Sequence, residues 1–243
     1  MNPKWDTYHS STQANALLES WSKAFPNLTS FYSIGKTLKD SPFMVLEITN
    51  KKTGASNTKP AYYYDGNIHA GELTGAEVAL HYALYLLSNY DKSARIKNLL
   101  DTRVIYIRPK FNPDGADLAL LTSTVLRSTP RPYDEDFDGL LDEDPGNDLD
   151  DNGIITNMRV KNPNGKFKIS KIDARVMEPR ELGETGDVYY DIYSEGIDDD
   201  KDGNYNEDGV GGIDMNRNFP RNWGLEFEQK GAGAYPLSEP ATR

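Results

Sequence analysis

A histidine and a glutamate three residues apart, His69 and Glu72, are the pair in this chain best suited to chemistry. They follow the strand-like run Ala61–Tyr64. Residues at this spacing on a helical turn face the same way, so we expect the two side chains to converge within about 5 Å. An imidazole and a carboxylate can bind zinc, which polarises a carbonyl and lowers the pKa of bound water. Taken alone, the pattern fits a surface turn at a helix start equally well.

Three further motifs follow in the sequence. They are Asn112-Pro113-Asp114-Gly115, Asp214-Met215-Asn216-Arg217-Asn218-Phe219 and Ser238-Glu239-Pro240-Ala241-Thr242. One such motif is common by chance, whereas four in this order are specific. Together they resemble the zinc carboxypeptidases of the M14 type, from about Trp21 to Arg243.

The resemblance implies a role for each matching position. His69 and Glu72 match the first two zinc ligands. Asn216 and Arg217 match the pair that binds the terminal carboxylate of the substrate, a role that suits the two parallel hydrogen bonds of a guanidinium. Arg127 matches the arginine that stabilises the oxyanion.

The family's third zinc ligand, its general base and its substrate-covering tyrosine would all lie beyond Arg243. We therefore expect this chain to be the N-terminal part of a catalytic domain, inactive as it stands. Arg131 is an alternative to Arg127. The other two histidines are not expected to serve the site, because His81 lies in the apolar helical run Ala76–Leu87 and should be packed, while His9 lies in a polar stretch and should be solvated.

Composition excludes several classes of protein. The 243 residues contain no cysteine, so disulfides and thiolate metal sites are excluded. A net charge of −11 disfavours nucleic-acid binding. No stretch is long and apolar enough to span a membrane, and residues 1–6 do not resemble a signal peptide.

The negative charge is concentrated in one segment, residues 131–214. This segment contains 24 acidic and 9 basic residues, a net charge of −15, whereas the rest of the chain has 14 acidic and 18 basic residues, a net charge of +4. The segment interrupts the resemblance between Arg127 and Asn216, so we interpret it as an acidic insert.

The insert contains three copies of an Asp-x-Asp-x-Asp/Asn-Gly pattern, the first half of a calcium loop. A glutamate at position twelve, which a helix-loop-helix calcium hand requires, is replaced by Pro145, Arg159 and Gly209. Shorter loops with bound calcium are therefore predicted, and a solvated acidic loop without a specific ion is the alternative. The candidate calcium ligands are Asp134, Asp136, Asp138, Asp142, Asp144, Asp148, Asp150, Asn152, Asp198, Asp200, Asp202, Asn206 and Asp208.

Alternating strand and helix patterns predict an α/β fold. Helices are expected at 14–25, 75–89 and 93–100, and strands at 43–48, 61–64 and 104–107. The resemblance implies a mixed eight-stranded sheet with helices on both faces. Residues 1–243 would then be the N-terminal part of that domain, with the later strands supplied by downstream sequence.

The leading hypothesis is a zinc metallocarboxypeptidase, secreted or periplasmic, that releases C-terminal residues from peptides with a free carboxylate. One alternative is a non-catalytic calcium-binding surface module. Another is a relative of the same fold that acts on a different amide or ester, or a degenerate member.

Overall fold

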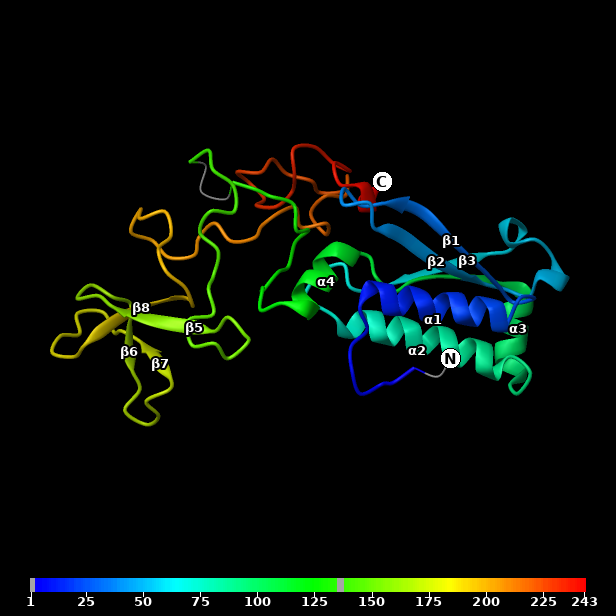
Figure 1. The fold of residues 1–243 in the computed structure, drawn as a ribbon, viewed down its shortest axis with the longest axis horizontal. Coiled ribbons are helices and arrows are strands. Elements are labelled where there is room, and N and C mark those ends of the chain that lie inside the picture. Colours follow the sequence, from blue (N-terminus) through cyan, green and yellow to red (C-terminus); the bar gives the residue numbers. More distant parts are fainter. Residues whose placement is uncertain (1–2, 135–137) are drawn as a thin grey trace. The chain divides into compact units, whose positions relative to one another are not determined.

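The computed structural model describes residues 3–134 and 138–243, which form two compact units. Unit 1 comprises Met1–Arg131 and Gly211–Arg243, and unit 2 comprises Pro132–Val210. Each unit has its own β-sheet (Figure 1). Among the described residues, no helix is both long and apolar enough to cross a membrane.

Unit 1 is built on a four-stranded mixed sheet with the order β1-β2-β4-β3. Its strands are β1 (Thr29–Lys36), β2 (Pro42–Ile48), β3 (Ala61–Asp65) and β4 (Val104–Arg108). β3 and β4 run parallel, and the other neighbours are antiparallel. The predicted mixed α/β class is confirmed. In the described part of the chain, however, this sheet has four strands, whereas the resemblance implies a single sheet of eight.

Helices α1, α2 and α3 cover one face of this sheet (Figure 1). Unit 1 contains α1 (Ser11–Ala24), α2 (Thr74–Asn89), α3 (Ala94–Thr102) and α4 (Pro113–Leu121). Leu18 and Trp21 of α1, Leu80 of α2 and Ile107 of β4 belong to one buried apolar cluster. Ser10 begins α1 with a capping box to Gln13, which satisfies amides at the helix start. Short 3-10 helices lie at Lys51–Thr53, Ser56–Thr58 and Pro240–Thr242.

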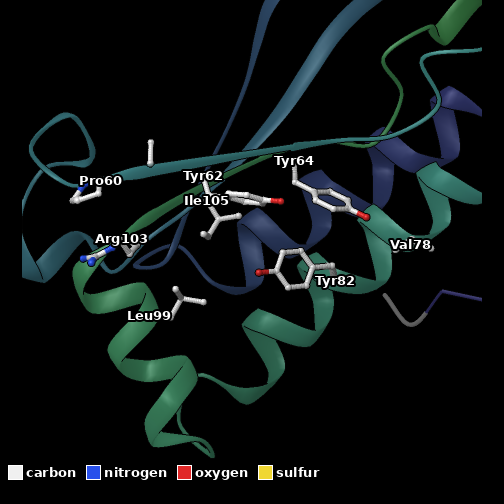
Figure 2. A pocket seen from close by; sticks show the side chains of 9 residues that line it. Pro60, Tyr62, Tyr64, Val78, Tyr82, Leu99, Arg103 and Ile105 are labelled. Carbon is white, nitrogen blue, oxygen red and sulfur yellow. The ribbon is translucent and has the colours of Figure 1, made fainter.

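The outer edge of β3 is unpaired among the described residues. Tyr62, on this strand, is 56% exposed. Beside it lies a cavity of about 550 Å³ lined mainly by apolar and aromatic side chains of β3, α2 and α3, which Figure 2 shows from close by. An unpaired edge next to apolar surface favours association with another strand.

Unit 2 lies within the acidic segment and contains a four-stranded antiparallel sheet that was not predicted. Its strands are β5 (Asn157–Lys161), β6 (Phe167–Ile169), β7 (Met177–Pro179) and β8 (Tyr189–Ser194), in the order β5-β8-β6-β7. Tyr189 and Tyr190 are its buried aromatic residues. The acidic loops are therefore attached to a small sheet.

Candidate metal and substrate site

His69 and Glu72 lie in the turn that connects β3 to α2. The backbone N–H of Glu72 donates to the His69 carbonyl at 3.1 Å, which closes a turn just before α2 begins at Thr74. The His69 Nδ1 and Glu72 Oε1 atoms lie 2.8 Å apart. The predicted convergence of the two side chains is observed, although a turn ahead of the helix produces it rather than the helix itself.

Backbone hydrogen bonds attach Arg127 to the same turn. The Ala70 N–H donates to the carbonyl of Arg127 at 3.0 Å, and the Gly71 N–H donates to the carbonyl of Leu126 at 2.9 Å. The Arg127 guanidinium consequently lies beside Glu72, with Nη1 3.7 Å from Oε1. The alternative residue Arg131 instead pairs with Glu239 at 2.9 Å. Of the two arginines, Arg127 is the one placed at the turn.

Asp214 connects the turn to the downstream motif. Its Oδ2 accepts a hydrogen bond from Arg127 Nε at 2.9 Å, and its Oδ1 lies 3.3 Å from His69 Nε2. The same Oδ1 accepts the Asn216 N–H at 2.9 Å, and the Asp214 carbonyl accepts the Arg217 N–H at 2.8 Å. Asn216 and Arg217 thus begin a turn anchored at the His69 site. The sequence motif includes Asp214, but no role was predicted for it. Its position as the acidic residue that begins the motif could have indicated one.

The donor atoms of this site fit a zinc ion. Both ring nitrogens of His69 are buried, and neither makes a hydrogen bond, although carboxylate oxygens lie nearby. A buried nitrogen without a hydrogen bond is costly unless another partner binds it. An imidazole nitrogen and a carboxylate oxygen on one side of a turn match the ligand types that zinc prefers. In the described ranges, no third His, Cys, Asp or Glu joins His69 and Glu72 in a compact ligand group.

The predicted burial of the other two histidines was wrong in both cases. His9 is 8% exposed, and its Nδ1 lies 2.7 Å from Glu77 Oε2, so it is buried in an ion-pair contact. His81 is exposed and meets the ring of Trp5 edge-on, with centroids 5.2 Å apart. The buried face of α2 contains Leu80, Ala83 and Leu87, and His81 lies on the other face of the helix.

Two charged residues, Asp65 and Arg108, lie at the carboxyl ends of β3 and β4. Arg108 is 3% exposed, and its guanidinium lies 4.3 Å from the ring centroid of Phe43 and 4.0 Å from that of Phe111. Arg108 Nη1 donates to the carbonyl of Ala241 at 3.3 Å, which joins the Ser-Glu-Pro-Ala-Thr motif to the sheet. Burial lowers the pKa of Arg108 and raises the pKa of Asp65, its partner across the strands.

The three acidic loops in unit 2 share one local geometry. In each loop, the first aspartate accepts the N–H of the glycine at position six, at 3.0 Å for Asp134, 2.7 Å for Asp148 and 3.2 Å for Asp198. The three glycines have φ values of 100°, 86° and 99°, a region that favours glycine. The glycine at position six therefore allows the backbone of each loop to turn sharply there. Asp136 lies outside the described residues.

The structure groups some of the predicted calcium ligands and leaves others apart. Ligand atoms within 4.8 Å of one another occur in four groups, namely Asp138-Glu143-Asp200, Asp144-Asp200-Glu207, Asp148-Asp150-Glu195 and Asp198-Asp200-Asp202. Among the predicted aspartate ligands, Asp134, Asp142 and Asp208 belong to none of these groups. Glu143, Glu195 and Glu207 were missed by sequence reasoning because they stand outside the repeated pattern.

Glu195 is an anchor for the second acidic loop. Its carboxylate accepts hydrogen bonds from the N–H groups of Leu149, Asp150 and Thr156 and from the Thr156 hydroxyl. The hydrogen bonds from Thr156 are the main cause that lowers the pKa of Glu195. Because Glu195 directly follows β8, this strand holds the second acidic loop in place.

Comparison with known proteins identifies relatives of the chain. A profile of the family described as zinc carboxypeptidase matches residues 14–176. Over 127 residues the chain is 34% identical to carboxypeptidase E of Caenorhabditis elegans, a match that covers 51% of this chain and 26% of that protein. Over 115 residues it is 29% identical to carboxypeptidase D of Mus musculus, covering 47% of this chain and 8% of that protein. The matched region spans about a quarter or less of these relatives.

Solved structures show the same fold. The structure of carboxypeptidase A from Helicoverpa armigera matches with a TM-score of 0.57 and 17% identity, covering 99% of this chain and 42% of that one. The structure of thrombin activatable fibrinolysis inhibitor matches with a TM-score of 0.54 and 20% identity, covering 98% of this chain and 42% of that one. At this level of identity, the comparison supports the fold alone.

Proposed function

Because the chain belongs to the zinc carboxypeptidase family, we propose that His69 and Glu72 are two ligands of a zinc ion in a metallocarboxypeptidase site. The observation that carries the proposal is the pair of buried His69 ring nitrogens without hydrogen bonds, one of them 2.8 Å from the Glu72 carboxylate. Bound zinc would supply Lewis-acid polarisation of a carbonyl and activation of water.

The chain's own residues bind and orient the substrate. The Arg127 guanidinium, held by Asp214, donates to the carbonyl oxygen of the scissile bond as negative charge develops there. Asn216 and Arg217 bind the substrate's terminal carboxylate, Arg217 through two parallel hydrogen bonds. The substrates of the whole protein are peptides with a free C-terminus, from which C-terminal residues are released.

The chain of 243 residues is proposed not to hydrolyse peptides by itself. The described residues supply two converging ligands, and neither His9 nor His81 adds a third, since one pairs with Glu77 and the other lies against Trp5. The third ligand and the general base are proposed to come from sequence beyond Arg243. We place the whole protein outside the cytoplasm, as a secreted or periplasmic enzyme.

Zinc titration tests this proposal. The chain's affinity for zinc is measured by competition with a chelating dye for the unaltered protein and for His69→Ala and Glu72→Gln. Each variant is expected to lose the binding event. His81→Ala is the matched control, because His81 is exposed on α2 and lies against Trp5 rather than at the turn. Equal zinc binding by His69→Ala and the unaltered chain would show that zinc binds elsewhere.

A second proposed function is calcium binding by unit 2. The shared loop geometry and the four carboxylate groups favour it, because uncompensated negative charge at this density opposes folding. Calcium prefers oxygen ligands and flexible geometry, which such loops provide. In the enzyme hypothesis bound calcium stabilises the acidic insert, and in the non-catalytic alternative calcium binding is the whole function. A relative acting on another amide or ester would differ in not requiring a free terminal carboxylate.

A further inference from the structure

Asn67 lies two residues before His69, at the start of the turn that presents the proposed ligands. It is 4% exposed and has a φ of 61°, a left-handed conformation that asparagine tolerates better than most residues. Its backbone carbonyl accepts the Asn112 N–H at 3.1 Å, so the residue is fixed to the segment that follows β4.

The Asn67 side chain holds the turn from inside. Its Nδ2 donates to the carbonyl of His69 at 2.8 Å and to the carbonyl of Ala70 at 3.0 Å. Both neighbours are carbonyl oxygens, which can only accept hydrogen bonds, so the amide nitrogen must be the atom that faces them. The Oδ1 atom is buried without a partner in the described part of the chain. Burying an unpaired acceptor costs free energy, which indicates that the two donated bonds are what this side chain contributes.

The His69 carbonyl connects the Asn67 amide to the second ligand. It accepts a hydrogen bond from Asn67 Nδ2 and another from the Glu72 N–H. The orientation of one peptide group therefore sets the positions of both His69 and Glu72. Because the Asn67 amide binds the carbonyls of both His69 and Ala70, the peptide group between these two residues has little freedom to rotate.

We propose that Asn67 is the positioning residue of the zinc site, whose side-chain amide fixes the spacing of His69 and Glu72 before metal binds. The inference rests on the proposed zinc function. Partners that orient metal ligands from outside the coordination sphere typically change metal affinity by about 10–100-fold. Asn67 would act through the ligands' backbone rather than through their side chains.

Asn67→Gly separates this role from a purely conformational one. Glycine adopts the left-handed conformation at least as readily as asparagine, so the backbone of the turn is accommodated while the two donated bonds are lost. Asn222→Gly is the matched control, because Asn222 also has a positive φ, 57°, but is exposed.

The experiment measures zinc affinity of the 243-residue chain by dye competition, alongside His69→Ala. Asn67→Gly is expected to bind zinc about 10–100-fold more weakly than the unaltered chain, while Asn222→Gly binds equally well. If Asn67→Gly binds zinc as tightly as the unaltered chain while His69→Ala loses binding, the inference about Asn67 is overturned and the zinc site stands. If His69→Ala also binds normally, both proposals fail.

Amide hydrogen exchange in the metal-free protein gives an independent reading. Asn67→Gly is expected to speed exchange of the Glu72 N–H, which donates to the His69 carbonyl, and to leave exchange in α1 unchanged. Unchanged exchange at Glu72 would contradict a positioning role. Faster exchange throughout unit 1 would show a general loss of stability and would also overturn the proposal.

Discussion

The Asp214 carboxylate lies between the proposed ligand His69 and the proposed oxyanion residue Arg127, with Oδ1 3.3 Å from His69 Nε2. His69 and Asp214 are 145 residues apart in the sequence, so only the tertiary fold brings them together. A carboxylate behind a metal-binding imidazole fixes the orientation of the ring and increases its basicity. Asp214 can therefore support two functional groups at once.

Replacing Asp214 with asparagine is expected to weaken zinc binding by about 10–100-fold, because the amide keeps the shape but removes the charge behind His69. Zinc affinity is measured as for the other variants, with thermal unfolding as a check on stability. Asp173→Asn serves as the control, since Asp173 pairs with Arg175 in unit 2. Unaltered zinc affinity in Asp214→Asn would remove the supporting role assigned to this carboxylate.

Arg127→Gln is expected to raise zinc affinity by about two- to tenfold. The guanidinium lies 3.7 Å from Glu72 and 2.9 Å from Asp214, so its positive charge opposes a second cation at the same carboxylates. Arg131→Gln is the matched variant, because Arg131 pairs with Glu239 instead. Dye competition at low ionic strength is the measurement. Weaker zinc binding in Arg127→Gln would mean that Arg127 organises the ligands more than it repels the metal.

Arg108→Met is expected to lower the free energy of unfolding of unit 1 by about 2–4 kcal/mol, since it removes a buried cation that stacks on two aromatic rings and donates to two carbonyls. Urea unfolding followed by tryptophan fluorescence reports on unit 1, because Trp5, Trp21 and Trp223 all belong to it. Arg103→Met is the control, as Arg103 is exposed. Equal destabilisation by the two variants would contradict this reading.

Burial and the nearby Glu47 carboxylate raise the pKa of Tyr32 to about 12. A pKa raised in the folded state contributes stability that is present below the ordinary value of 10 and is lost as pH rises toward 12. The free energy of unfolding should therefore decrease as the pH rises from 10 to about 12, and it should decrease less steeply in Tyr32→Phe. Urea unfolding at a series of alkaline pH values measures how the free energy of unfolding depends on pH in both proteins. The same dependence in both would contradict a raised pKa of Tyr32.

Calcium is expected to raise the melting temperature of unit 2, and a chelator to lower it, because the bound ion offsets carboxylate repulsion. Differential scanning calorimetry measures the transition. Asp200→Asn should reduce the calcium effect most, since Asp200 belongs to three of the four carboxylate groups. A melting temperature that is the same in calcium and in chelator would favour the solvated-loop alternative.

Local features of unit 1 could be predicted from the sequence. The helix at 75–89 and the strands at 61–64 and 104–107 have continuous apolar patterns, and the structure places α2, β3 and β4 there. The convergence of His69 and Glu72 was predicted from helical spacing, and a turn just before α2 produces it in the structure.

Other features depend on tertiary contacts. The Asp214 carboxylate and the Asn67 amide act on the turn through contacts that no spacing rule reveals. Burial of His9 depends on Glu77, which is 68 residues away in the sequence. The sheet of unit 2 was missed because its strands are short, 3–6 residues, and lie among turn-forming residues.

The most direct test of the zinc site is to locate the metal by anomalous X-ray scattering at the zinc edge in crystals of the chain grown with zinc. We predict an anomalous peak from a zinc ion bound by His69 Nδ1 and a Glu72 carboxylate oxygen, and no such peak in His69→Ala. Zinc found only at the carboxylates of residues 134–208, with none at His69, would contradict the proposed zinc site.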